Sequence, residues 1–206
     1  MATDIDICNE ALALLGERAD VTSISPAEGG RFAERCARDY PIARNLVLEA
    51  YPWSFATRRA ALAVLLEDYC GWRFGYARPG DALCITAVIE EDDRYFEAPK
   101  EFICETESTR GQQMILTNLE DAWCRYTVRV TNTPLLPELV CQAITYKLAG
   151  LLAGNILKGT PGQSVAKAME ERYNTALALA KDYDMRQRRR DTDLRSTWTK
   201  TRGWRN

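Results

Sequence analysis

The alternation of apolar and polar positions predicts two helices near each end of the chain. Between residues 31 and 51, apolar side chains recur every three or four positions, which places them on one face of a helix. This pattern keeps its phase across Pro41, and we therefore predict one helix here rather than two. The same spacing predicts further helices at about 4–15, 137–158 and 163–185.

Small residues in the third predicted helix indicate how it packs on the fourth. Ala149 and Gly150 recur four positions later as Ala153 and Gly154, which lets another helix approach closely. A break at residues 159–161, Gly-Thr-Pro, separates the two helices. Two long helices joined by a short break form an antiparallel hairpin. With the first two helices, this hairpin is expected to close a four-helix bundle.

The region between the helical halves, about 55–130, shows the patterns of β-strands. Residues 72–78 alternate aromatic and other side chains, and residues 82–89 are apolar on both faces. Two further runs flank a Ser-Thr-Arg-Gly turn within 102–116, as a hairpin does. Residues 58–66 fit a helix or a strand by periodicity, and we prefer an extended segment because strand-like stretches follow it.

These patterns together predict an α+β fold that is mainly α. We expect a four-helix bundle with an inserted small antiparallel β-sheet and an extended C-terminal tail. Residues 1–185 are predicted to form a single domain, and residues 186–206 a basic tail. Residues 17–30 are expected to be a connector between the first two helices.

The composition narrows the chemistry that the chain can perform. The sequence contains no histidine, which excludes Ser-His-Asp and Cys-His nucleophiles and histidine zinc sites. It also lacks the glycine motifs that cradle phosphates. The acidic run at 90–93 lacks the ligand spacing of a calcium loop, which favours a solvated loop. Glu49 and Asp81 are two carboxylates that could act together as an acid pair, but nothing in the sequence predicts that they lie close together. We predict no catalytic, cofactor-binding or metal-binding residues.

Two further features indicate the environment of the protein. Its seven cysteines are scattered and include no Cys-x-x-Cys pair, so we expect free thiols in a reducing compartment. The most apolar stretch, 139–157, is divided by Lys147 and also contains Gln142 and Asn155. We predict a buried helix there and no membrane span.

Charge distinguishes the tail from the rest of the chain. Residues 186–206 carry eight basic and two acidic side chains, whereas the whole chain has a net charge of −2, so residues 1–185 carry −8. The tail is either a solvated end or a segment that orders on a partner, with nucleic acid as another possible ligand. The candidate partner-binding residues are Arg188, Arg189, Arg190, Leu194, Trp198, Arg202 and Trp204.

Five stretches, in order over about residues 5–180, carry a resemblance to a known family. They are Cys8–Gly16, Ala43–Ala56, Arg59–Leu62, Tyr76–Leu83 and Lys147–Ala153. In these stretches the chain resembles the head-to-tail adaptor proteins of short-tailed bacteriophages, the tail tubular protein A type. The matching residues are structural rather than catalytic, and their common order is what carries the resemblance.

The resemblance implies a virion protein, made in the cytoplasm of a bacterial host, that performs no reaction. In this family the subunits form a homo-oligomeric ring of twelve copies below the portal protein, where the ring continues the DNA channel and receives the tail nozzle protein. The C-terminal part of the relatives reaches toward the portal, which makes Trp198 and Trp204 candidates for that contact. An acidic body is compatible with a channel that DNA crosses without sequence-specific binding.

Two other functions remain open from the residues alone. A DNA-binding accessory protein would use the basic tail, and its binding would depend steeply on salt. A cell-wall glycosidase would need only carboxylates, which the missing histidine does not exclude. We rank the adaptor first and the glycosidase last.

Overall fold

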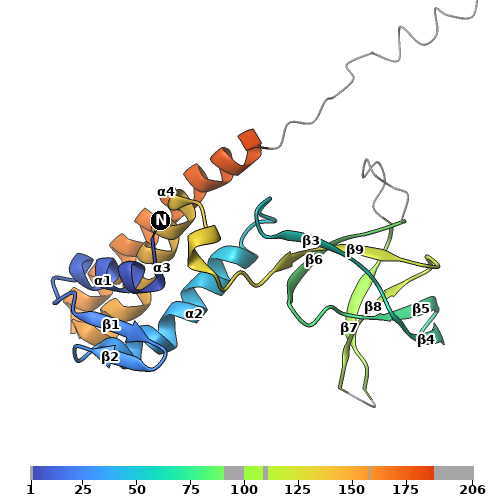
Figure 1. Cartoon of the computed structure of the whole chain (residues 1–206), viewed down its shortest axis with the longest axis horizontal. Helices are drawn as coiled ribbons and strands as arrows, with labels where there is room; N and C mark the ends of the chain where they lie inside the picture. Colours follow the sequence, from blue (N-terminus) through green and yellow to red (C-terminus); the bar gives the residue numbers. More distant parts are fainter. Residues whose placement is uncertain (1, 91–99, 109–110, 158, 188–206) are drawn as a thin grey trace, which may run out of the picture.

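The computed structural model describes residues 2–90, 100–108, 111–157 and 159–187. Figure 1 shows a helical part at one end of the molecule and a β lobe at the other, joined where α2 leads into β3. Within the described residues the chain forms four α-helices and nine strands in three antiparallel sheets.

Four of the predicted elements are helices, close to the expected positions. They are α1 (Asp4–Leu14), α2 (Ala33–Glu49), α3 (Glu138–Ile156) and α4 (Gly159–Gln187), with a short 3-10 turn, η1 (Thr133–Leu135), before α3. Helix α2 continues through Pro41, as predicted. Helix α4 begins earlier than predicted because Pro161 lies in its first turn, where a missing N–H costs no intrahelical bond.

Helix α3 is the centre of the helical part. It contacts α1, α2 and α4, and Ile144, Leu148 and Leu152 are completely buried along it. The predicted close approach of α4 is confirmed, because a Cβ placed on Gly150 would touch Met169 at 3.7 Å. Among the described residues, α3 alone is long and apolar enough to cross a membrane, but core helices of soluble proteins pass the same test.

The prediction of a four-helix bundle is wrong. Helices α1 and α2 contact α3, whereas α4 packs mainly on α3 alone. With 11 residues, α1 is about 16 Å long, too short to line a bundle beside the 29 residues of α4. A β-hairpin also packs on α1 and α2, and a bundle made of four helices alone contains no such hairpin.

This hairpin lies in the segment expected to be a connector. It consists of β1 (Val21–Ile24) and β2 (Ala27–Gly29), which pair antiparallel. The side chain of Asn9 in α1 holds the hairpin in place. The Asn9 Nδ2 donates to the Val21 oxygen and the Asn9 Oδ1 accepts from the Val21 nitrogen, each at 3.0 Å. Strands of three and four residues leave too little alternation for the sequence to reveal them.

The β lobe is larger than the small single sheet that we predicted. Its strands are β3 (Thr57–Ala61), β4 (Val64–Tyr69), β5 (Trp72–Ala77), β6 (Ala82–Ile89), β7 (Ile103–Thr106), β8 (Gln113–Thr117) and β9 (Trp123–Val128). They form one sheet in the order β3-β9-β6 and a second in the order β4-β5-β8-β7. The preference for extended chain over 58–66 is confirmed. The buried Tyr76 links the turn before β9 to β5, since its hydroxyl donates to the Leu119 oxygen at 2.8 Å.

The cysteines act mainly as packing residues. Of the seven free thiols, those of Cys8, Cys36, Cys124 and Cys141 are buried in the core. A hydrogen bond with Cys36, reinforced by burial, raises the pKa of the Cys8 thiol. Burial raises the pKa of Cys124 to about 11. These two thiols therefore stay protonated at neutral pH and are poor nucleophiles.

Candidate functional site

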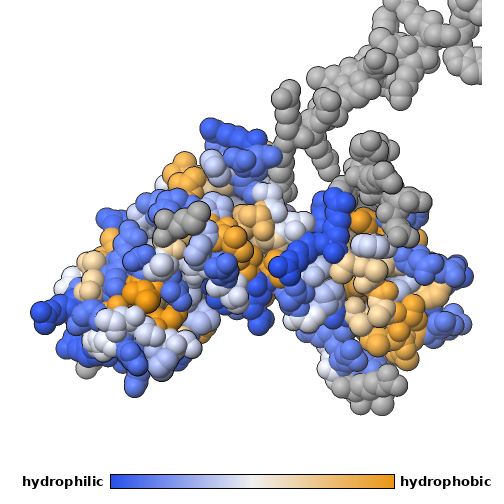
Figure 2. Space-filling model, viewed as in Figure 1, coloured by the Kyte–Doolittle hydropathy of each residue, from blue (hydrophilic) through white to orange (hydrophobic). Residues whose placement is uncertain are grey.

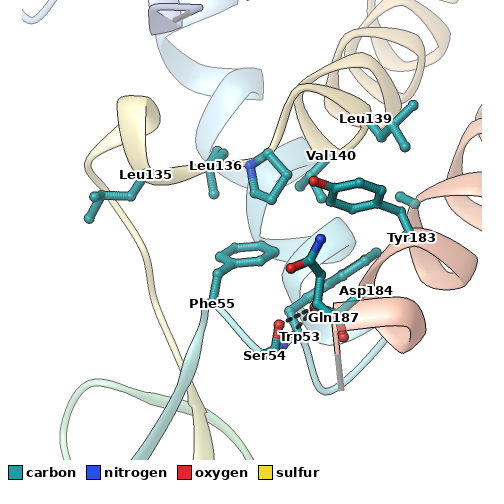
Figure 3. A pocket seen from close by; sticks show the side chains of 12 residues that line it. Trp53, Ser54, Phe55, Leu135, Leu136, Leu139, Val140, Tyr183, Asp184 and Gln187 are labelled. Carbon is teal, nitrogen blue, oxygen red and sulfur yellow. Dashed lines mark hydrogen bonds between the residues drawn. The ribbon is translucent and has the colours of Figure 1, made fainter. Parts of the chain in front are cut away.

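A groove lies where the helical part meets the β lobe. It has a volume of about 570 Å³, in the range of ligand-binding clefts. Three segments far apart in sequence form it: the junction of α2 and β3, η1 with the start of α3, and the last turns of α4 (Figure 3). Its lining residues are Trp53, Ser54, Phe55, Leu135, Leu136, Pro137, Leu139, Val140, Ala180, Tyr183, Asp184 and Gln187.

Trp53 forms the floor of the groove. Its side chain is completely buried, and its Nε1 donates to the Val47 oxygen on α2 at 2.9 Å. The rings of Tyr51 and Phe55 flank it, with centroids 5.0 and 5.8 Å away. Helix α2 ends at Glu49, and Pro52 cannot continue it, so the chain turns here from α2 toward β3. The aromatic cluster thereby fixes one wall of the groove.

A buried carboxylate ties α4 to the same junction. Asp184 is 4% exposed, and its Oδ1 accepts hydrogen bonds from the Ser54 nitrogen at 2.9 Å and the Ser54 Oγ at 2.5 Å. Hydrogen bonds to a charged acceptor are stronger than those between neutral groups. The last turns of α4 are therefore held against the α2–β3 junction, and the width of the groove is fixed.

We predict that Ser54→Ala loosens this attachment. The variant removes the hydroxyl donor and leaves Asp184 with the Ser54 nitrogen, so we expect the free energy of unfolding to fall by about 1.5–3 kcal/mol. Urea denaturation measures this change. Thr175→Ala is the control, because its hydroxyl bonds only to a helix carbonyl at the surface and its loss should cost less than about 0.5 kcal/mol. If Ser54→Ala and Thr175→Ala lowered the free energy of unfolding equally, the hydrogen bonds between Ser54 and Asp184 would have no special role in stability.

The walls of the groove expose apolar side chains. Leu135 is 63% exposed and Tyr183 is 47% exposed, and Figure 3 shows Phe55 from the α2–β3 junction and Tyr183 from α4 on opposite sides of the groove. Hydrophobic surface is also visible close to the junction of the two parts in Figure 2. Cys141, next to the lining residue Val140, donates to the Leu136 oxygen at 3.8 Å, and burial raises the pKa of this thiol to about 11. The surface is suited to an apolar ligand rather than to acid–base chemistry.

A second hollow, of about 450 Å³, is polar and lies on the β lobe beside the end of α2. Arg78 lies in its wall and donates to the Ala82 and Leu83 oxygens at 3.1 and 2.7 Å. Glu49 also lines it, but Asp81 does not and instead pairs with Arg58 at 3.1 Å. The structure therefore does not bring Glu49 and Asp81 together in this cleft.

The described residues contain no group of three or more side chains that is suited to holding a metal ion. Of the acidic run 90–93, the structure describes Glu90, which pairs with Lys100 at 2.8 Å. The other three residues of the run lie outside the described part of the chain.

The predicted partner-binding residues also lie outside the described part of the chain, which ends at Gln187. They are Arg188, Arg189, Arg190, Leu194, Trp198, Arg202 and Trp204. The groove was not predicted from the sequence. Tyr183 continues the helical spacing of the buried residues of α4, such as Ala176 and Ala180, and this spacing alone predicts that Tyr183 is buried.

Comparison with protein-family models and with curated proteins finds no match for this chain. The function is therefore inferred from the resemblance of its five stretches and from the surfaces that the structure exposes.

Proposed function

We propose that the chain is a head-to-tail adaptor, a structural virion protein whose copies form a ring below the portal protein. The observation that carries the proposal is exposed apolar surface on two separate helices. Ile42 and Leu46 of α2 are 49% and 39% exposed, and Leu179 and Tyr183 of α4 are 54% and 47% exposed. Exposed apolar side chains gathered on helix faces are typical of protein–protein contacts.

Two different surfaces are what a closed ring requires. In a ring each subunit contacts its neighbours head to tail, so one patch meets a different patch of the next copy. Helices α2 and α4 each pack on α3, which leaves their outer apolar side chains on separate faces of the helical part. The face of α2 is then free to meet the face of α4 in a neighbour.

The stretches that resemble the adaptor family also fit this assignment. Three of them fall on α1, on the end of α2 and on α3, which pack together in the helical part. Twelve copies, the portal and tail nozzle as partners, the virion as location and DNA passing through the ring belong to the proposal. The charge of −8 on residues 1–185 supports a channel lining that repels DNA. The basic tail, with Trp198 and Trp204, is the proposed portal contact.

Ring assembly with the portal protein of the same virus tests the proposal. We expect electron microscopy of the mixture to show rings with the wild-type chain, and at least about tenfold fewer with Ile42→Asp or Leu179→Asp, because each places a charge in an apolar interface. Val64→Asp is the matched control, since Val64 is 49% exposed on β4, outside the helical faces. Absence of rings with the wild-type chain at every concentration would overturn the proposal.

A further inference from the structure

We propose that the groove at Trp53 holds the C-terminal tail of the same chain, residues 188–206, when the protein is free. The proposal concerns an intramolecular contact and does not depend on the adaptor function. It follows from the chemistry of the groove, from the composition of the tail and from the point at which the described chain ends.

The groove offers an apolar cleft with one negative charge. The exposed Leu135 and Tyr183 and the partly buried Phe55 provide its apolar and aromatic walls. Asp184 is the single charged residue among the described residues that line it, and neither lysine nor arginine is present there. An apolar segment with positive charges nearby is therefore the ligand that this surface fits.

The tail has this composition. Residues 188–206 include Leu194, Trp198 and Trp204 as large apolar side chains, with seven basic and two acidic residues around them. Tryptophan and arginine are the residue types that most often dominate the binding energy of an interface. The rest of the chain is acidic, so the net charges of tail and body attract each other.

The connection favours the tail of the same chain over that of a neighbour. Gln187, the last described residue, itself lines the groove, so the tail begins at the edge of the cleft. Leu194 and Trp198 follow seven and eleven residues later, and these lengths of extended chain span up to about 25 and 40 Å. Such a short link gives the tail an effective concentration in the millimolar range at its own groove.

A tail docked in this way changes what the free protein exposes. The docked tail covers Tyr183, one of the apolar side chains that α4 otherwise exposes to solvent, and it buries the Trp198 side chain in the groove. A partner that binds the tail more tightly than the groove does would release it and uncover this end of α4.

Photo-cross-linking of the full-length chain tests the proposal. The photoreactive amino acid p-benzoylphenylalanine replaces Tyr183 in the groove or, as a control, Tyr146, which lines a separate shallow groove between α3 and α4. After irradiation of dilute protein, we expect species of monomer mass in which position 183 is joined to residues 194–204. The yield from position 146 should be at least about tenfold lower, because the apolar anchors belong to the first groove.

A second variant separates specific docking from chance collisions. Trp198→Ser with Trp204→Ser, in the chain that carries the probe at position 183, should lower the cross-link yield about tenfold while the far-ultraviolet circular dichroism is unchanged. Equal yields from positions 183 and 146, or a yield that the tryptophan changes do not alter, would overturn the proposal. Cross-links at dimer mass would do so as well, because the occupant would then be a second copy. So would the absence of any cross-link to the tail.

Discussion

Trp53→Ala is expected to lower the free energy of unfolding by about 3–5 kcal/mol, the usual cost of deleting a fully buried tryptophan side chain. The indole packs against the rings of Tyr51 and Phe55, and its loss leaves a cavity at the floor of the groove. The Val47 oxygen also loses the indole N–H, which lies 2.9 Å away in the wild-type protein. Urea denaturation followed by circular dichroism measures the change.

Trp72→Ala is the matched control for this prediction. Trp72 is partly exposed on β5, so removing the same side chain there should cost less than about 1.5 kcal/mol. Trp53→Phe should lie between the two variants, because it keeps most of the volume but loses the N–H donor. A Trp53→Ala loss no larger than that of Trp72→Ala would show that the junction tolerates the cavity, and that the aromatic cluster does not fix the groove.

The sequence predicted those elements whose signal is local. Helix α2 was recognised because its apolar positions keep their spacing through Pro41, and packing on α3 preserves the helix there. The close approach of α4 to α3 was predicted in the same way from the small residues of α3, and at Gly150 an added Cβ would lie 3.7 Å from Met169. Strand β5 was visible as alternating aromatics, of which Tyr76 proves to be completely buried.

The sequence did not predict features that depend on distant partners. Strand β3 pairs with β9, more than sixty residues later, and no pattern within either strand specifies that partner. A single sheet was therefore expected where two exist. The groove raises the same difficulty, because Trp53, Leu135 and Tyr183 come from three separate parts of the chain. Tyr183 has the spacing of a core residue, and only the arrangement in space shows that Leu135 and Tyr183 remain exposed.

Gly29→Ala is expected to destabilise the protein by about 3 kcal/mol or more, through the hairpin that the sequence did not reveal. Gly29 has a φ of +102°, which L-residues rarely adopt, and it ends β2. A Cβ at this position would lie 2.3 Å from the Asp20 oxygen and 2.7 Å from the Thr22 nitrogen. Both atoms belong to the backbone, so the hairpin must shift to accommodate the methyl group.

Gly16→Ala separates the clash at Gly29 from the conformational strain of a positive φ. Gly16 has a φ of +75°, but a Cβ there would meet nothing within 4 Å, so we expect a loss of only about 1 kcal/mol. Urea denaturation compares the two variants, and hydrogen exchange at Val21 reports whether the hairpin has left Asn9. We expect faster exchange at Val21 in Gly29→Ala alone. If both variants lose the same stability and Val21 stays protected, the hairpin adapts to the added methyl group and its tight contact with Asp20 is not required for the fold.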